Sequence, residues 1–353
     1  MAWQVTIEPL GEVIEVEDDQ TILDAALRAG IYLPHACGHG LCGTCKVQVL
    51  EGEVDLGDAS PFALMDMERD EGMCLACEAR PLSDVVIEAE IDEDPDAENH
   101  PVEDFEATVA RIVQHSPRFR SIWLDLPGEG IRFQAGQYVN VHVPGLDEPR
   151  AFSIATPPQE PNRIELIVGR VPGGAGTAWL HDELAEGDSL RFTGPYGRFF
   201  VRKSAHRPML FLAGGSGISA PKAMILDLLN EGCEEDITLI HGVRSQAELM
   251  HADRFRELAL RHPNFHYHPV LSDEPAGSDW RGLRGMVHEA AAELFDGRFE
   301  GMKAYLCGPP PMVDACITTL MRGRLFERDI YTEQFFTNDP EQQRQRSPLL
   351  KIG

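Results

Sequence analysis

Cysteine spacing restricts the fold of this chain more strongly than any other feature of its sequence. Cys37, Cys42 and Cys45 have C-x4-C-x2-C spacing, and Cys77 follows 32 positions after Cys45. Four thiolates at these intervals can hold a 2Fe–2S cluster. Glycines at positions 38, 40 and 43 let the backbone between them take unusual conformations and bring N–H groups close to the sulfur atoms. The sequence therefore predicts a cluster-binding loop with these four cysteines as the iron ligands.

Structural zinc is the alternative for the same segment. Cys42 and Cys45 form one C-x2-C pair and Cys74 and Cys77 form another, a spacing that a four-thiolate zinc site also uses. Iron makes Cys37 essential and Cys74 dispensable, whereas zinc makes the reverse true. We favour iron because a zinc ribbon explains neither Cys37 nor the glycines around it.

Charge is distributed unevenly along the chain. Residues 1–100 contain 24 Asp and Glu against 4 Lys and Arg, which accounts for −20 of the total charge of −27. This field repels nucleic acid and anionic membranes, and it would attract a basic patch on a partner protein. The chain also shows no signal peptide and no apolar run of about 18 residues. We therefore expect a cytoplasmic protein with reduced cysteines and no membrane or nucleic-acid partner.

Hydrophobic patterning divides the 353 residues into three domains. Expected strands at 4–9, 13–17, 46–50 and 85–90, with a helix over 21–29, give a compact α+β domain over 1–93. An acidic linker with two prolines follows at 94–102. Short strands separated by Gly/Pro turns predict an antiparallel β-barrel over 103–203. Strands alternating with helices predict an α/β, Rossmann-like domain with a parallel sheet over 204–336, before a tail at 337–353.

Three short motifs follow one another in the barrel segment. Arg150, Phe152 and Ser153 fit R-x-[FY]-S, a glycine-rich loop at 172–177 opens a helix, and G-P-Y-G occupies 194–197. In this order the motifs resemble the FAD-binding barrel of the ferredoxin–NADP reductase superfamily. The resemblance implies that Arg150 pairs with the FAD phosphates, Phe152 lies along the flavin or its ribityl chain, and Ser153 lies near flavin N5. It also implies that Gly174, Gly176 and Thr177 hold the pyrophosphate. One departure is Arg170, because the family pattern has its basic residue one position earlier.

The α/β domain carries two further motifs of the same superfamily. A predicted strand is followed by a G-G-x-G-x-x-P loop and a helix. A standard dinucleotide-binding fold has an acidic residue after its second strand, but here the second strand ends at Arg244. The resemblance assigns nicotinamide dinucleotide binding to Gly214, Gly215, Gly217 and Pro221. A second motif, C-G-P-P-x-M, adds Cys307, Gly308, Pro309, Pro310 and Met312, with Cys307 beside the nicotinamide C4.

The segment 331–336 resembles the terminal E-x-F motif of the superfamily. There the resemblance implies that Phe335 covers the flavin and that Glu333 approaches Ser153. Ser153, Cys307 and Glu333 are therefore the expected catalytic residues. A hydrophobic C-terminal strand without such a role would have a similar sequence.

Across its whole length the chain resembles the reductase components of multicomponent phenol hydroxylases. The resemblance implies a ferredoxin domain of the β-grasp fold, and an NADH oxidoreductase that uses FAD and a 2Fe–2S cluster. Electrons would pass to a di-iron hydroxylase component that docks on the acidic ferredoxin domain. Two alternatives remain at this stage, a reductase for a Rieske aromatic-ring dioxygenase and a zinc-stabilised binding protein. NADPH in place of NADH also remains open, because Arg244 can meet a 2′-phosphate.

Overall fold

The computed structural model describes residues 2–91 and 94–334. Two compact units divide the chain, the first ending at Glu103 and the second beginning at Asp104. The elements of the first unit are β1 (Ala2–Glu8), β2 (Glu12–Glu17), α1 (Ile22–Arg28), β3 (Lys46–Glu51), β4 (Val54–Asp55), α2 (Asp66–Asp70), β5 (Met73–Leu75), β6 (Arg80–Pro81) and β7 (Val85–Glu88).

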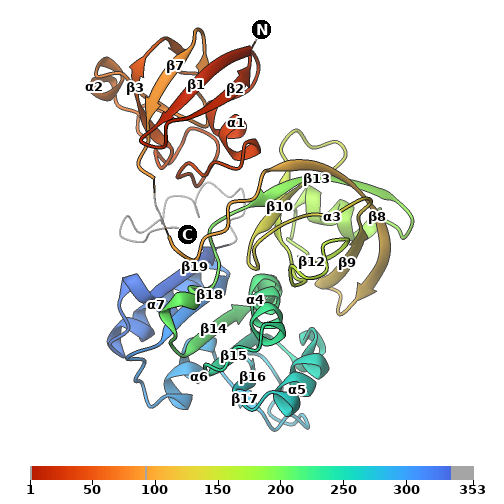
Figure 1. Cartoon of the computed structure of the whole chain (residues 1–353). Helices are drawn as coiled ribbons and strands as arrows, with labels where there is room; N and C mark the ends of the chain where they lie inside the picture. The colour runs from red at the N-terminus through yellow and green to blue at the C-terminus, as the bar shows by residue number, and fades with distance from the viewer. Residues whose placement is uncertain (1, 92–93, 335–353) are drawn as a thin grey trace. The chain divides into compact units, whose positions relative to one another are not determined.

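A five-stranded mixed sheet in the order β2-β1-β7-β3-β5 forms the first unit, with β1 and β7 parallel (Figure 1). Helix α1 begins after Thr21, whose hydroxyl accepts the Asp24 N–H at 3.3 Å and so caps the helix. Its buried face, including Ile22 and Ala26, packs on the core of this sheet. The segment expected to be a solvated linker ends at the buried Val102, whose N–H donates to the Leu27 carbonyl at 3.0 Å.

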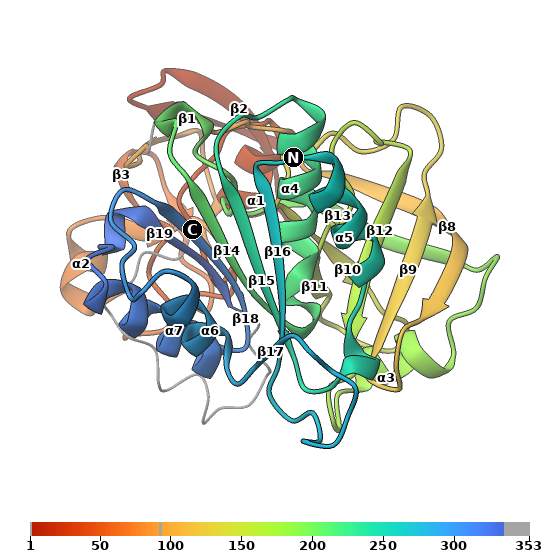
Figure 2. The same cartoon turned by 90° about the horizontal axis from the view of Figure 1, so that it is seen from below.

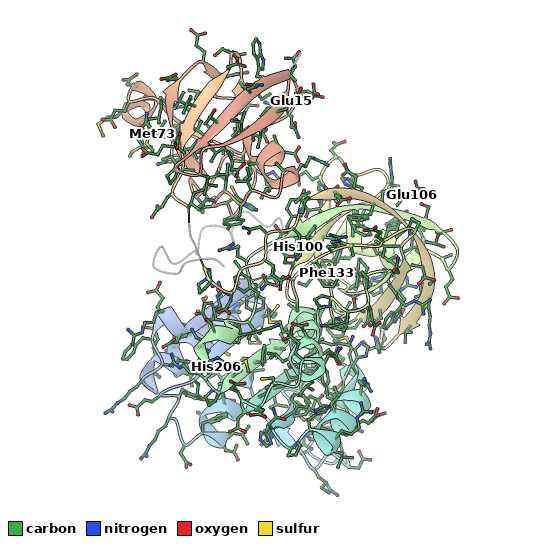
Figure 3. The ribbon with its side chains drawn as sticks, viewed as in Figure 1. Glu15, Met73, His100, Glu106, Phe133 and His206 are labelled. Atoms are coloured by element: carbon green, nitrogen blue, oxygen red, sulfur yellow. The ribbon has the colours of Figure 1, made fainter. Side chains whose placement is uncertain are left out.

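The second unit contains the barrel and the α/β lobe. Its barrel elements are β8 (Glu103–Gln114), β9 (Phe119–Asp125), β10 (Tyr138–His142), β11 (Arg150–Ser153), β12 (Arg163–Gly169), α3 (Ala175–Asp182) and β13 (Ser189–Tyr196). The strand order is β11-β10-β13-β8-β9-β12, and a bridge between Ile154 and Leu166 brings the two edges together. Phe133 lies among the side chains that fill this barrel (Figure 3).

The lobe alternates strands and helices. Its elements are η1 (Lys203–Ala205), β14 (Met209–Gly214), η2 (Gly215–Ile218), α4 (Ser219–Asn230), β15 (Ile237–Val243), η3 (Gln246–Glu248), α5 (Ala252–Arg261), β16 (Phe265–Leu271), β17 (Leu283–Arg284), α6 (Val287–Leu294), β18 (Lys303–Gly308), α7 (Pro310–Arg322), η4 (Glu327–Asp329) and β19 (Ile330–Gln334). The parallel sheet has the order β17-β16-β15-β14-β18-β19, with α4 and α5 on one face and α6 and α7 on the other (Figure 2). Pro310 starts α7, where a missing N–H costs nothing.

The predicted fold class is confirmed, since all three architectures are present. Strands β16 and β17 were not predicted. Within residues 2–91 and 94–334, no helix has the length and hydrophobicity needed to cross a bilayer.

Candidate functional site

The cysteine loop lies between α1 and β3 and turns its backbone N–H groups toward sulfur. Cys37 Sγ accepts from the Leu41 N–H at 3.4 Å, and Cys77 Sγ accepts from the Gly40 N–H at 3.3 Å. Such contacts stabilise thiolates that bind iron. Gly43 has a φ of +74°, and a Cβ there would come within 3.0 Å of the Ala63 carbonyl oxygen. A side chain at this position would therefore push the neighbouring segment away from the loop.

The four predicted iron ligands come together as two pairs. Cys37 donates to Cys42 and Cys77 donates to Cys45, and these hydrogen bonds lower the pKa of Cys42 and Cys45 and raise the pKa of Cys37 and Cys77. No three of these sulfur atoms lie mutually within 4.8 Å, judged over the described residues. A single tetrahedral zinc ion needs four sulfurs about 3.8 Å apart, given a Zn–S bond of about 2.3 Å. Two pairs instead suit two iron atoms with two thiolates each.

Cys74, the remaining cysteine of the first unit, is buried. It lies on β5, has no exposed surface, and belongs to the hydrophobic core of the first unit. Burial raises its pKa to about 12. The side chain therefore behaves as a small apolar core residue. Cys45 and Cys77 are buried in the same core, so it is the pairing of Cys37 with Cys42 that favours iron over zinc.

Apolar side chains border the cysteine loop on its solvent side. Leu41, between two of the cysteines, is 61% exposed, and Phe62 is 96% exposed. The segment that carries Phe62 packs on the loop, because the Ser60 N–H donates to the Gly40 carbonyl at 3.0 Å. Met65 and Met67 are also more than half exposed. These four residues are referred to below as the apolar rim.

The predicted flavin residues lie on β11 and at the start of α3. Arg150 donates to the Glu148 carbonyl at 2.8 Å, and a third of its side chain is exposed. Gly176 lies against it, since a Cβ there would be 3.1 Å from Arg150 Cγ. Gly174 is the N-cap of α3, and the Thr177 hydroxyl accepts the Val171 N–H at 3.0 Å. The free N–H groups of this helix start therefore lie beside a cation, an arrangement suited to a pyrophosphate.

Ser153, Cys307 and Glu333 meet although they lie on three different strands. Ser153 donates its hydroxyl to the Glu333 carboxylate at 3.1 Å, and the Cys307 thiol lies 3.9 Å from the same oxygen. Burial raises the pKa of Glu333 to about 7, against the opposing effect of these two hydrogen bonds. Burial also raises the pKa of the Cys307 thiol, which therefore stays protonated. The three side chains form a buried contact between the barrel and the lobe.

The two predicted nicotinamide motifs are packed against each other. A Cβ on Gly217 would come within 2.3 Å of the Cys307 carbonyl oxygen, and one on Gly214 would come within 2.4 Å of Met312 Sδ. Gly215 belongs to the same loop, and Pro221 lies in the first turn of α4. Gly308, Pro309 and Pro310 join β18 to α7. Both loops thus lie at the carboxyl ends of adjacent parallel strands, where open α/β sheets bind ligands.

His241 supports the first of these loops and was not predicted. Its ring on β15 is completely buried, and Nε2 donates to the Gly215 carbonyl at 3.2 Å. Burial lowers its pKa to about 4, so the ring is neutral at physiological pH. Only the fold could identify it, because the contact joins β15 to the loop that follows β14.

A cavity of about 580 Å³ lies beside the α3 glycine loop, with three arginines in its wall, Arg118, Arg170 and Arg244. Arg170 also pairs with Asp182. Arg118 pairs with Glu248 at 3.2 Å, and the same carboxylate accepts the Arg244 N–H. Glu248 thus lies close to the end of β15, where the sequence itself has Arg244. Phe335 lies outside the described residues.

Three protein families match successive parts of the chain. Residues 5–82 match the 2Fe-2S iron-sulfur cluster binding domain, residues 105–201 the oxidoreductase FAD-binding domain, and residues 211–317 the oxidoreductase NAD-binding domain.

Curated relatives match over nearly the full length. The chain is 57% identical to the reductase component of phenol 2-monooxygenase from Pseudomonas sp. (strain CF600) and 54% identical to a phenol hydroxylase protein from Acinetobacter pittii. Each alignment covers 99% of both chains. Among solved structures, the ferredoxin reductase of carbazole 1,9a-dioxygenase superposes with a TM-score of 0.75 at 26% identity, covering 95% of this chain and 99% of that one.

Proposed function

Because this chain belongs to the family of phenol hydroxylase reductase components, we propose that it oxidises NADH and delivers the electrons, through FAD and a 2Fe–2S cluster, to the hydroxylase component of a phenol monooxygenase. The contact that carries the proposal is the one among Ser153, Cys307 and Glu333. It joins the FAD-binding motif to the NAD-binding motif in a single buried site.

Each cofactor has a set of residues whose chemistry fits it. Cys37, Cys42, Cys45 and Cys77 would hold the cluster as two thiolate pairs. The FAD residues are Arg150, Phe152, Ser153, Gly174, Gly176, Thr177 and Phe335. The NADH residues are Gly214, Gly215, Gly217, Pro221, Cys307, Gly308, Pro309, Pro310 and Met312. When bound, FAD takes up an electron pair as hydride and returns electrons singly, which matches NADH to a one-electron cluster.

The side chains around the hydride site control position and protons. Cys307 stays a neutral thiol and presents no charge to a nicotinamide ring beside it. Glu333 holds or releases a proton near neutral pH and exchanges hydrogen bonds with the Ser153 hydroxyl. When Glu333 is protonated, the Ser153 O–H would be free to donate a hydrogen bond to a bound flavin.

The partner would dock on the apolar rim beside the cysteine loop. Residues 37–78 contain nine Asp or Glu against two Lys or Arg, so the rim is set in a strongly negative surface. Both cations are engaged, Lys46 with Glu68 and Arg69 with backbone carbonyls. The matching surface on the hydroxylase component would have an apolar centre and a basic border. Such a contact would bring the half-exposed Cys37 and Cys42 against the electron acceptor.

Two other functions make different predictions. A reductase for a Rieske dioxygenase would support turnover with that oxygenase, and the 26% identity to the carbazole enzyme is well below the identity to the phenol enzymes. A zinc-stabilised binding protein would require Cys74 as a ligand in place of Cys37, yet Cys37 is the cysteine that pairs with Cys42.

Metal and flavin analysis of the purified protein, with visible spectra before and after anaerobic NADH, tests the reductase activity. We expect one FAD and about two irons per chain, and loss of visible absorbance on NADH addition. NADH-driven hydroxylation of phenol after mixing with a phenol hydroxylase component tests the partner. A colourless zinc protein that does not react with NADH would contradict the proposal.

A further inference from the structure

A buried ion pair joins the barrel to the α/β lobe. Lys222 on α4 donates to the Glu165 carboxylate on β12 at 2.7 Å and to the Ala155 carbonyl at 2.7 Å. The Lys222 side chain is 6% exposed and that of Glu165 is completely buried. Glu165 and Ala155 are themselves joined, because the Ala155 N–H donates to the Glu165 carbonyl at 2.8 Å. One ammonium group thus holds two neighbouring barrel strands.

Two histidines complete this cluster. His251, just before α5, donates from Nε2 to the other Glu165 oxygen at 2.9 Å. The ring of His115 lies 5.1 Å from that of His251 and bonds the Ser121 hydroxyl at 2.8 Å. Burial would raise the pKa of Glu165, but the charge of Lys222 and the hydrogen bond from His251 lower it to about 2. Glu165 is therefore ionised at neutral pH.

His115, Glu165 and His251 have the ligand types and proximity of a metal site. However, both Glu165 oxygens already accept hydrogen bonds, and Lys222 supplies a positive charge at 2.7 Å. A divalent cation would be repelled by that ammonium group. The cluster is consequently better explained as a directional contact between two domains.

The ion pair lies close to both halves of the hydride site along the chain. Ala155 follows Ser153 by two residues. Lys222 follows Gly217 by five residues and lies on α4, the helix after the glycine loop. Glu333 also bonds Ser153 directly. Two polar contacts between the barrel and the lobe are therefore made within two residues of each other, at the end of β11.

Other polar contacts also join the barrel to the lobe, namely Arg118 with Glu248 at 3.2 Å and Gln159 with Asp227 at 2.7 Å, and apolar packing lies beside them. Phe119, Ala155 and Phe199 of the barrel share one hydrophobic cluster with Met224 and Ile225 of α4. Apolar packing is strong but has little directional preference. Two apolar surfaces can therefore pack in slightly different relative orientations with little difference in free energy. A buried ion pair specifies one arrangement, because any shift leaves a charge unpaired in a dry interface.

We propose that Lys222 and Glu165 are positioning residues that fix the orientation of the lobe on the barrel, and thereby the approach of the nicotinamide to the flavin. This inference rests on the proposed NADH oxidation. Hydride transfer depends steeply on the approach of the reacting atoms, and a misplacement of about 1 Å can cost about 100-fold in rate. Neither residue needs to touch a cofactor to have this effect.

The test separates positioning from stability with a double variant. Lys222→Met combined with Glu165→Gln removes both charges, retains the approximate volumes and leaves His251 a hydrogen-bond partner. Replacing a complete buried pair is often neutral for stability, whereas Lys222→Met alone leaves Glu165 underpaired and is expected to destabilise. Lys303→Met is the control, since Lys303 is also buried but its partner Asp329 lies in the same lobe and keeps Arg207.

Stopped-flow reduction of the FAD-loaded variants by NADH gives a limiting rate and an apparent Kd. We expect the double variant to unfold within about 4 °C of the wild type, to keep its Kd for NADH, and to lose about tenfold in limiting rate. Hydrogen–deuterium exchange of residues 150–156 and 219–225, measured without NADH, should rise. The Lys303→Met variant should match the wild type in both measurements.

A double variant with the wild-type limiting rate and exchange would overturn the positioning role and leave the pair as a stabilising contact only. A wild-type protein that NADH does not reduce would instead contradict the proposed function, and this is decided before any variant is compared.

Discussion

The Ser153 hydroxyl donates to the Glu333 carboxylate at 3.1 Å, across 180 positions of sequence. This hydrogen bond ties the last described strand of the lobe to the flavin strand of the barrel. Glu333 is half-buried, and burial raises its pKa toward neutrality. The titration of Glu333 should therefore be visible in the chemistry at this site.

Replacing Glu333 by Gln should remove a pH dependence from flavin reduction. Burial raises the pKa of Glu333 to about 7, so the carboxyl is protonated below neutrality and charged above it. Only the protonated carboxyl leaves the Ser153 O–H free to donate to a bound flavin. The limiting rate of flavin reduction in the wild type should therefore fall as pH rises through about 7. Stopped-flow rates between pH 5.5 and 8.5 measure this.

The Glu333→Gln variant should give a nearly flat profile of rate against pH, while Glu327→Gln, a change outside the site, should keep the wild-type profile.

The pH dependence of stability gives a second check. The pKa of Glu333 is about 7 in the folded protein and about 4.5 in the unfolded chain. The free energy of unfolding should therefore fall as pH rises from 4.5 toward 7, because only the unfolded chain releases the Glu333 proton in that range. An equal pH dependence in wild type and Glu333→Gln would show that another group titrates.

Local motifs were predictable from the sequence, and the family resemblance implied the contact between Ser153 and Glu333, whereas the contact between Lys222 and Glu165 was not predictable. Cys37, Cys42 and Cys45 lie within nine residues, and their spacing alone indicates the loop. Lys222 and Glu165 lie 57 positions apart, and neither belongs to a motif. A lone lysine in a helix is usually solvent-exposed, so its burial depends on how the barrel packs on α4.

Glu248 was missed for a related reason. A standard dinucleotide-binding fold has its acid at the end of the second strand, and Arg244 stands at that position of β15 instead. The short helix η3 folds the chain back, so that the Glu248 carboxylate accepts the Arg244 N–H at 3.2 Å. A turn of this kind depends on local backbone geometry that spacing alone does not reveal.

Cys37→Ala and Cys74→Ala should have opposite effects on iron content. Cys37 is half-buried on the loop and should be required for the cluster, whereas Cys74 fills the apolar core and binds nothing. We expect Cys37→Ala to lose the cluster absorbance, and Cys74→Ala to keep about two irons per chain with about 1 kcal/mol lower stability. Iron analysis and thermal unfolding measure the two effects. Retention of the metal by Cys37→Ala would favour the zinc arrangement.

Glu248→Gln should relax the preference for NADH over NADPH. Glu248 is 12% exposed and holds Arg118 and the Arg244 backbone beside the cavity. An acidic group after the second strand favours a ribose 2′-OH and repels a 2′-phosphate. We expect kcat/KM for NADPH to rise about tenfold, with a change below about threefold for NADH. Glu257→Gln, an exposed change on α5, is the control. Unchanged selectivity would place the adenosine ribose elsewhere.

Phe62→Ala should weaken docking of the hydroxylase component without affecting the reductase itself. Phe62 is 96% exposed, so removing its ring creates no cavity and should leave folding unchanged. Exposed aromatic residues at the centre of an interface often carry a large share of its binding energy. The KM for the hydroxylase component should therefore rise about tenfold, while NADH-driven reduction of ferricyanide keeps its rate.

Leu260→Ala is the matched control, because Leu260 is 88% exposed but lies on α5 of the other unit. Raised ionic strength should increase the KM for the hydroxylase in the wild type, since the border of the rim is acidic and the attraction is screened. If Phe62→Ala instead slowed reduction of the cluster by NADH and left the KM for the hydroxylase unchanged, the apolar rim would serve transfer within the chain. The docking surface for the hydroxylase would then have to lie on another face of the ferredoxin domain.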